Sequence, residues 1–140
     1  MNSDRLPFQD GEFTIEFELD EVAERLTLTL KGRIVSQTYY DICVGFYSKL
    51  ADPSRYDRLV DCTASKGYVT FDHLDALSRL WRSWLATAER VVNVAVVSDD
   101  PLTHARMGIV DHLSHRQRHR AFYTLAEAEA WLETHGKRQG

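Results

Sequence analysis

The stretch Tyr56–Asp75, YDRLVDCTASKGYVTFDHLD, predicts a strand that passes through a loop into a helix. The apolar pair Leu59–Val60 marks the strand, Tyr56–Cys62, and apolar residues at helical spacing follow Phe71. In open sheets of parallel strands and helices, crevices form at the carboxyl ends of the strands. We therefore expect any functional site of this chain to lie at this crossing from strand to helix.

Two strands with alternating residues precede this stretch. Apolar residues alternate with polar ones in Glu12–Leu19 and in Arg25–Ile34, and a period of two predicts strands with one buried face. The link Asp20–Glu24 is short enough for a hairpin. The polar positions hold mainly Glu and Thr, so we expect one face of this hairpin to meet water.

A helix is expected at Thr38–Leu50, between the hairpin and the third strand. Thr38 and Asp41 fit the capping-box pattern at its start. The helix should end before Pro53, because the residue that precedes a proline avoids helical backbone angles. Its expected inward stripe is Tyr39, Cys43, Phe46 and Leu50.

The second half of the chain alternates helices with strands. Val91–Ser98 is a run of mostly β-branched apolar residues, typical of a central parallel strand that is buried on both faces. Asp100 and Pro101 predict the cap and first residue of a helix that ends near Arg116. Its expected inward residues are Leu102, Ala105, Ile109 and Leu113. The other expected elements are helices at Phe71–Ala88 and Leu125–Thr134 and a strand at Arg120–Tyr123.

The order of these elements predicts one α/β domain over residues 11–135. An N-terminal hairpin and three strand–helix units would give a mixed, mostly parallel sheet of about five strands with about four helices. Residues 1–10 and 136–140 are expected to be flexible ends.

The composition is that of a globular protein: of 140 residues, 44% are hydrophobic and 27% are charged. The formal net charge of −4 argues against a general nucleic-acid binder. The longest apolar run, Val91–Val97, is too short to span a bilayer, and the polar start of the chain does not resemble a signal peptide. Cys43 and Cys62 lack metal-binding spacing. We expect a cytoplasmic protein with reduced thiols and no transmembrane segment.

Three stretches of the chain resemble one protein family. They are Leu26–Gly32 (LTLTLKG), Arg58–Thr63 (RLVDCT) and Ala121–Leu132 (AFYTLAEAEAWL). The chain is similar there to the SpoIIAA-like proteins, small bacterial domains of STAS/Sec14 type, and the similarity covers about Glu12–Thr134. The resemblance implies a β-α superhelix. Within this wider group, anti-sigma-factor antagonists bind proteins under phosphorylation control, whereas Sec14-like domains hold a lipid.

The resemblance also implies a candidate phosphorylation site. In the antagonists, a serine that begins the helix after the third strand is phosphorylated. Thr70, within Val69–His73, stands at about the place of that serine. The aspartate before and the glycine after the family's serine are absent here.

The loop after the third strand is a candidate anion-binding region, made by Thr63, Ser65, Lys66 and Thr70. Unpaired amides at a helix N-terminus attract negative charge, and hydroxyls and a lysine there could hold a phosphate or carboxylate. Threonine and serine also cap helices and shape loops without any ligand, and the chain has no Walker motif. We favour local capping.

No set of side chains predicts catalysis or a cofactor. Cys62 with His73 as its base would form a nucleophile, but cysteine is among the most commonly buried residue types. The G-x-S-x-G motif of serine hydrolases is absent. We therefore expect no enzyme activity and no cofactor.

A further candidate region is HLSHRQRHR, residues 112–120. His112, His115 and His119 would share one face of a continuous helix and could bind zinc, although a helix end near Arg116 argues against this metal site. The candidate basic patch comprises His112, His115, Arg116, Arg118 and Arg120. It could attract an acidic partner or an anionic membrane surface. The alternative, which we favour, is that these residues complement a helix C-terminus.

The helix that follows Phe71 has a wide apolar face. Its candidate interaction surface is Leu80, Trp81, Trp84 and Leu85. Tryptophan is enriched in protein interfaces, so an exposed Trp84 would mark a partner or dimer surface. The alternative that we favour is packing of both tryptophans on the sheet and neighbouring helices.

These observations lead to two functional hypotheses. The first is a non-enzymatic STAS-like module that binds another protein, or a second copy of itself, in a regulatory role. The wide apolar face and the resemblance support it. The second is a carrier of a small apolar ligand or lipid, of Sec14 type, which would need an apolar cavity with a few polar groups at its mouth.

Overall fold

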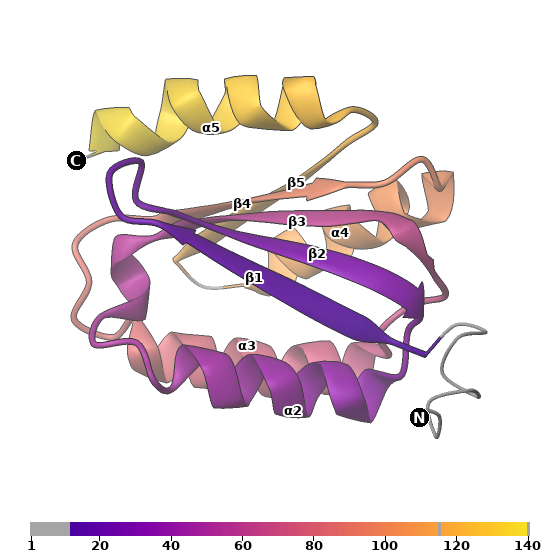
Figure 1. Ribbon diagram of the computed structural model, residues 1–140. Helices are drawn as coiled ribbons and strands as arrows, with labels where there is room; N and C mark the ends of the chain where they lie inside the picture. Colours follow the sequence, from indigo (N-terminus) through magenta and orange to yellow (C-terminus); the bar gives the residue numbers. More distant parts are fainter. Residues whose placement is uncertain (1–11, 115, 140) are drawn as a thin grey trace.

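Residues 12–114 and 116–139 are described by the computed structural model, with side chains described as far as His135. The chain forms a five-stranded sheet in the order β1-β2-β3-β4-β5 (Figure 1). The first pair, β1 and β2, is antiparallel, and every later pair is parallel. The strands are β1 (Thr14–Asp20), β2 (Arg25–Arg33), β3 (Asp57–Lys66), β4 (Val92–Val97) and β5 (Gln117–Phe122). The expected α/β fold with a mixed sheet is confirmed.

Helices cover both faces of the sheet (Figure 1). On one face lie α2 (Ser36–Tyr47), α3 (Phe71–Trp84) and α4 (Pro101–Leu113), and on the other lies α5 (Leu125–Gln139). A short 3-10 helix, η2 (Pro53–Arg55), leads into β3. None of the described helices is both long and apolar enough to cross a membrane.

The sheet separates two hydrophobic cores. The larger core lies under α2 and α3 and includes Leu26, Leu28, Leu30, Cys43, Tyr47 and Trp81. The smaller core lies under α5 and consists of Leu59, Ala95, Val97, Ala128, Trp131 and Leu132. Because successive residues of a strand point to opposite faces, β3 and β4 contribute alternate side chains to each side of the sheet.

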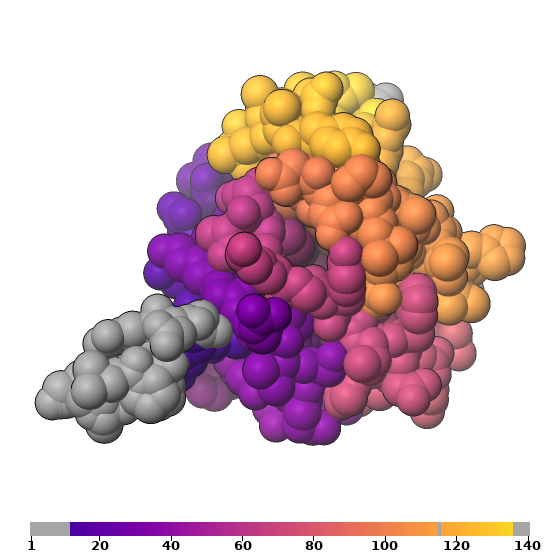
Figure 2. Space-filling view, turned by 90° about the vertical axis from the view of Figure 1, so that its right-hand side faces the viewer, coloured from indigo at the N-terminus to yellow at the C-terminus, as the bar shows by residue number. Residues whose placement is uncertain are grey.

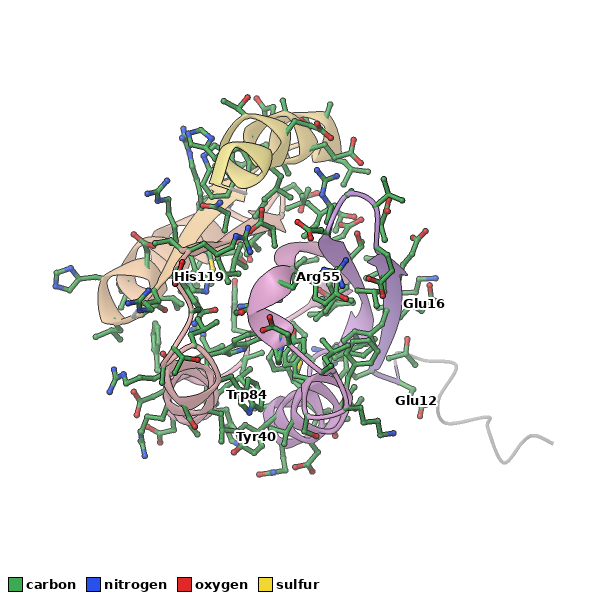
Figure 3. All side chains as sticks on the ribbon, turned by 90° about the vertical axis from the view of Figure 1, so that its left-hand side faces the viewer. Glu12, Glu16, Tyr40, Arg55, Trp84 and His119 are labelled. Atoms are coloured by element: carbon green, nitrogen blue, oxygen red, sulfur yellow. The ribbon has the colours of Figure 1, made fainter. Side chains whose placement is uncertain are left out.

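Several local predictions are confirmed. The hairpin alternates as expected: Leu26, Leu28 and Leu30 are buried, and Glu16 on β1 is exposed and points away from the helices (Figure 3). All residues of β4 are buried, as its run of β-branched residues predicted. Asp100 caps α4, its carboxylate accepting from the Leu102 amide at 2.9 Å.

The predicted capping box of the first helix is wrong. The helix α2 begins at Ser36, two residues before Thr38, and its N-cap is Val35, which makes no side-chain cap hydrogen bond. Asp41 instead accepts from the side-chain amide of Gln37 at 2.9 Å, one helical turn away. Thr38 and Asp41 therefore lie inside the helix and do not cap its N-terminus.

The predicted inward stripe of α4 is also wrong. Leu102, Ile109 and Leu113 are about half exposed, at 50%, 50% and 54%. Met107 packs against the larger core instead. Two hydrogen bonds hold the side of α4 that carries Met107 toward the sheet. His104 Nε2 donates to the Ser98 carbonyl at 2.8 Å, and Arg106 donates to the Val69 carbonyl.

The remaining element bounds differ by a few residues. The helix α3 ends at Trp84, before the predicted Ala88, and α4 ends at Leu113, before Arg116. The strand β3 runs four residues past Cys62 to Lys66, and β5 begins at Gln117, three residues before Arg120. The longer β5 brings Gln117 and His119 into the sheet beside β4.

Candidate functional site

A cavity of about 470 Å³ lies between the sheet and the helices α3 and α4. Its mouth is at the carboxyl ends of β3 and β4, where Lys66–Tyr68 and Asp99–Asp100 line it. Figure 2 looks onto this end of the molecule, which is hollowed between the loop after β3 and the beginning of α4. This is the end of the sheet at which a crevice was expected from the sequence.

The walls of the cavity are mainly apolar. Leu30, Val60, Val94 and Val96 line it from the sheet, and Leu77 and Met107 line it from the helices. A volume of this size lies within the range of small-molecule sites, which are mostly apolar with a few placed polar groups. The cavity has the shape and lining of a ligand pocket.

One charged side chain lies inside this apolar pocket. Arg58 is only 6% exposed, in the middle of the sheet between its neighbours Leu26 and Val94. Its guanidinium lies 4.1 Å from the centre of the Trp81 ring, and its Nη2 donates to Gln117 Oε1 at 2.5 Å. Trp81 and Gln117 thus hold the guanidinium in place, yet neither supplies a negative charge.

Three nitrogen atoms around this position have no hydrogen-bond partner. They are Nη1 of Arg58, Nε1 of Trp81 and Nδ1 of His119, all on residues that line the cavity. Burial lowers the pKa of His119 to about 3, and the nearby Arg58 charge adds to this effect. His119 is therefore neutral at physiological pH. Most buried polar groups in folded proteins are paired, and no described residue of this chain pairs with these nitrogens, so they are available to a polar group inside the cavity.

The acid next to Arg58 in the sequence is used elsewhere. Asp57 accepts from Arg90 Nη2 at 2.7 Å and from the Asn93 amide at 2.8 Å. None of the ion pairs found in the described part of the chain involves Arg58. The sheet thus contains two buried charged neighbours, of which Asp57 has a counter-charge and Arg58 has none.

The predicted anion-binding region lies partly at the mouth of this cavity. Thr63, Ser65 and Lys66 line it, whereas Thr70 does not. The Thr63 hydroxyl donates to Asp61 Oδ1 at 2.8 Å, and the Ser65 hydroxyl donates to the Cys62 carbonyl at 2.9 Å. Both hydroxyls therefore shape the loop. That the region binds an anion stays a prediction.

Thr70 caps α3, as the favoured interpretation predicted. Its Oγ1 accepts from the His73 amide at 3.3 Å and lies 2.7 Å from His73 Nδ1. The other ring nitrogen of His73 lies 3.2 Å from Gln37 Oε1. His73 is thus engaged with Thr70 and Gln37 on the surface.

The predicted interaction surface on α3 is largely inside the protein. Trp81 and Leu85 are buried in the larger core, and Leu80 and Trp84 are partly buried against it. The Trp81 and Trp84 rings pack edge to face with their centres 5.0 Å apart. Figure 3 shows Trp84 between α3 and α2, and its ring packs edge to face on Tyr47 with the ring centres 6.0 Å apart. Both tryptophans therefore pack inside the protein, which was the favoured alternative.

The predicted basic patch does not form one cluster. His112 is exposed on α4, Arg118 and Arg120 are exposed on β5, and His119 lines the cavity. Arg116 donates to the Ala88 carbonyl and so connects two loops. His115 lies outside the described residues. Within residues 12–114 and 116–139, no group of three or more His, Cys, Asp or Glu side chains could hold a metal ion.

Cys62 also lines the cavity, as a protonated thiol. Burial, with a smaller contribution from the adjacent Asp61 charge, raises its pKa to about 12. Burial likewise raises the pKa of Cys43 to about 11. Because the thiolate is the reactive form of cysteine, neither thiol is activated as a nucleophile.

Sequence reasoning missed the buried cation of the cavity. Arg58 lies in the predicted strand Tyr56–Cys62, which was recognised from Leu59 and Val60, and it stands two residues before Val60 and so shares its face of β3. An arginine on the same face as an apolar residue of a central strand must point into the protein. That signal was present in RLVDCT.

Comparisons with known proteins support the fold. No protein-family model matches the sequence, and no curated protein matches it either. Among solved structures, this chain is similar to an uncharacterised protein of the DUF3478 family from Shewanella loihica PV-4, which has a SpoIIAA-like fold. The TM-score is 0.58 at 18% sequence identity, and the match covers 86% of this chain and 93% of that one. The chain described here therefore has a SpoIIAA-like fold.

Proposed function

We propose that this protein binds a small apolar molecule in the cavity between the sheet, α3 and α4. The observation that carries the proposal is the cavity itself, about 470 Å³ of space with apolar walls and unpaired nitrogens on its lining. Protein interiors are normally packed to the density of organic crystals. A space of this size in a domain of this size is best explained by a ligand that fills it.

Binding, and not catalysis, is the proposed activity. The thiol of Cys62 is held protonated by burial, with its pKa raised to about 12. His73, the base considered for it, contacts Thr70 and Gln37. Nucleophilic catalysis needs a base within hydrogen-bond reach of an activated nucleophile, whereas the Cys62 thiol is protonated and His73 does not line the cavity. We propose a binding domain with no cofactor of its own.

A fluorescent probe tests this proposal directly. N-phenyl-1-naphthylamine is neutral and apolar, and its fluorescence rises when it leaves water. We expect saturable binding of one molecule per chain. Val96→Phe places a ring in the cavity and should weaken binding at least tenfold, whereas Val22→Phe, at a position that is 90% exposed, should leave it unchanged. Absence of saturable binding, or equal binding by both variants, would contradict the proposal.

Binding of another protein or of a second copy is the second candidate function, and one observation favours it. Leu102, Ile109 and Leu113 form an exposed apolar stripe along α4, and contiguous exposed apolar surface marks interaction sites. Light scattering after size exclusion should then report a dimer, and Ile109→Lys should return it to a monomer. Both functions are compatible with a cytoplasmic protein, because Cys43 and Cys62 are free thiols.

A further inference from the structure

We infer that the ligand of the cavity is an apolar molecule with a single carboxylate, and that this carboxylate pairs with Arg58. The inference rests on the proposed binding function and names the chemical class of the ligand. Three independent features of the cavity carry it: the charge of Arg58, the arrangement of unpaired nitrogens around it, and the distribution of the other charges along the lining.

The first feature is a buried cation without a counter-charge. Arg58 is 6% exposed, and among the described residues no carboxylate comes within 4.0 Å of its guanidinium. An isolated charge in an apolar environment is strongly unfavourable unless it is paired. The Trp81 ring and the Gln117 amide oxygen stabilise the guanidinium in part. A ligand carboxylate would supply the charge that the described residues do not.

The second feature is the set of nitrogens that surround the same position. Nη1 of Arg58 and Nε1 of Trp81 are N–H donors without an acceptor, and Nδ1 of His119 is equally unpaired. A carboxylate has two oxygens and accepts several hydrogen bonds at once. Bonds between ionised partners are about twice as strong as neutral ones. One carboxylate beside Arg58 could therefore accept from the unpaired Nη1 and still offer an oxygen to a second donor on this part of the lining, such as Trp81 Nε1.

The third feature is the number of charges along the lining, which argues for one negative charge and against a phosphate dianion. The interior contains Arg58 and the neutral His119. The other cations on the lining, Lys66 and Arg106, are joined there by Asp99 and Asp100. Arg106 already donates to the Val69 carbonyl and lies over the Phe71 ring at 4.3 Å. Among the described residues on the lining, Arg58 is thus the one cation that is not joined by a carboxylate on its part of the lining.

The position of Arg58 also determines which end of the ligand lies deep in the cavity and which end faces the mouth. Arg58 is near the amino end of β3, and Lys66, at the mouth, is the last residue of the same strand. At about 3.3 Å per residue, these two positions lie roughly 25 Å apart along the strand. Val60, Val94 and Val96 line the space between them. The apolar part of the ligand therefore lies along these valines and points toward the mouth.

The test compares three probes with the same chain and different heads: dodecanoate, dodecan-1-ol and dodecyl phosphate, each titrated by calorimetry below its aggregation limit. Wild-type protein should bind dodecanoate at least tenfold more tightly than dodecan-1-ol. Arg58→Met should weaken dodecanoate binding at least tenfold and leave dodecan-1-ol binding unchanged or tighter. Arg118→Met, which removes an exposed arginine of β5, is the matched control and should bind all three probes as the wild type does.

Each other outcome has a definite meaning. If dodecan-1-ol binds as tightly as dodecanoate, or if Arg58→Met binds dodecanoate normally, the carboxylate inference is overturned while the proposed function stands. Preference for dodecyl phosphate overturns the carboxylate in favour of a phosphate head. If no probe binds and N-phenyl-1-naphthylamine does not bind either, the proposed function fails.

A second measurement covers the case in which Arg58→Met does not fold. Dodecanoate labelled with ¹³C at the carboxyl carbon reports its own ionisation by NMR in the wild-type complex. A carboxylate paired with Arg58 should stay ionised to a lower pH than the free acid, because a nearby positive charge favours the charged form. If the carboxyl group of bound dodecanoate becomes protonated at a higher pH than that of the free acid, the inference is overturned.

Discussion

Neighbouring residues of β3 and β4 meet different surroundings on the two faces of the sheet. On one face, Leu59 and Val97 are closed over by α5 through Trp131 and Leu132. On the other, Arg58, Val60 and Val96 face a cavity. Because the same two strands supply both sets of side chains, the sheet backbone is not the cause of the difference. The face under α5 is packed closely, whereas the other face, which also carries the larger core, leaves a cavity and an unpaired charge that stability alone does not require.

The largest expected effect comes from the packed face. Trp131→Ala should lower the free energy of unfolding by about 3–5 kcal/mol, because a buried aromatic side chain is replaced by a void. Urea unfolding followed by circular dichroism measures this loss. Leu125→Ala, at an exposed position of the same helix, should cost much less. A small loss for Trp131→Ala would mean that α5 does not close a stabilising core.

A pair of identical substitutions on adjacent residues compares the two faces more sharply. Val97→Phe adds volume to the packed core and should cost about 1–3 kcal/mol. Val96→Phe adds the same volume on the cavity side, where there is room, and should cost clearly less. Thermal or urea unfolding of both variants gives the difference. Equal losses would indicate that the cavity cannot accept a side chain, and the proposed difference between the faces would be lost.

Acid should lower the free energy of unfolding because His119, on the cavity lining, is held neutral in the folded protein. The pKa of His119 is lowered from 6.5 to about 3, first by burial and then by the Arg58 charge. Between these values the unfolded chain holds a proton on His119 and the folded protein does not, so stability falls as the pH falls from about 6.5 toward 3. His119→Gln should flatten this dependence in urea unfolding at several pH values, whereas His112→Gln, on the surface, should not. An unchanged slope in His119→Gln would show that other groups cause the acid sensitivity.

The smallest effect is expected at Thr70, the N-cap of α3. Thr70→Ala should cost about 1 kcal/mol, because the N-cap bond to the His73 amide is lost, and Thr70→Ser should restore it. Probe binding should not change, since Thr70 does not line the cavity. Weakened probe binding in Thr70→Ala would assign Thr70 to the site as well as to the cap.

The sequence predicted the fold well because local patterns decide most of it. The alternation of Leu26, Leu28 and Leu30, the apolar run of β4 and the cap at Asp100 each reflect a requirement that neighbouring residues impose. The inward face of α4 was not predictable in this way. Leu102, Ile109 and Leu113 make the more apolar stripe, yet the helix turns Met107 inward because His104 and Arg106 bond to distant carbonyls.

The structure has a cavity at the ends of the parallel strands, where a crevice was expected, and Ser65 and Lys66 line it. That this loop binds a ligand stays a prediction. The polar centre of that crevice depends on Arg58, Trp81 and His119, which come from three separate elements. Only the folded chain brings these residues together, so no local pattern contains the site.

The polar attachment of α4 bears on how fast a guest could enter and leave. This helix borders the cavity, and Tyr68 and His104 fasten it by hydrogen bonds to Asp100 and to the Ser98 carbonyl. Each such bond contributes only about 0.5–1.5 kcal/mol net. Moving α4 aside would break a few of these bonds and would leave the packed core under α5 untouched. If the proposed ligand enters past α4, it can therefore do so while the core under α5 stays packed.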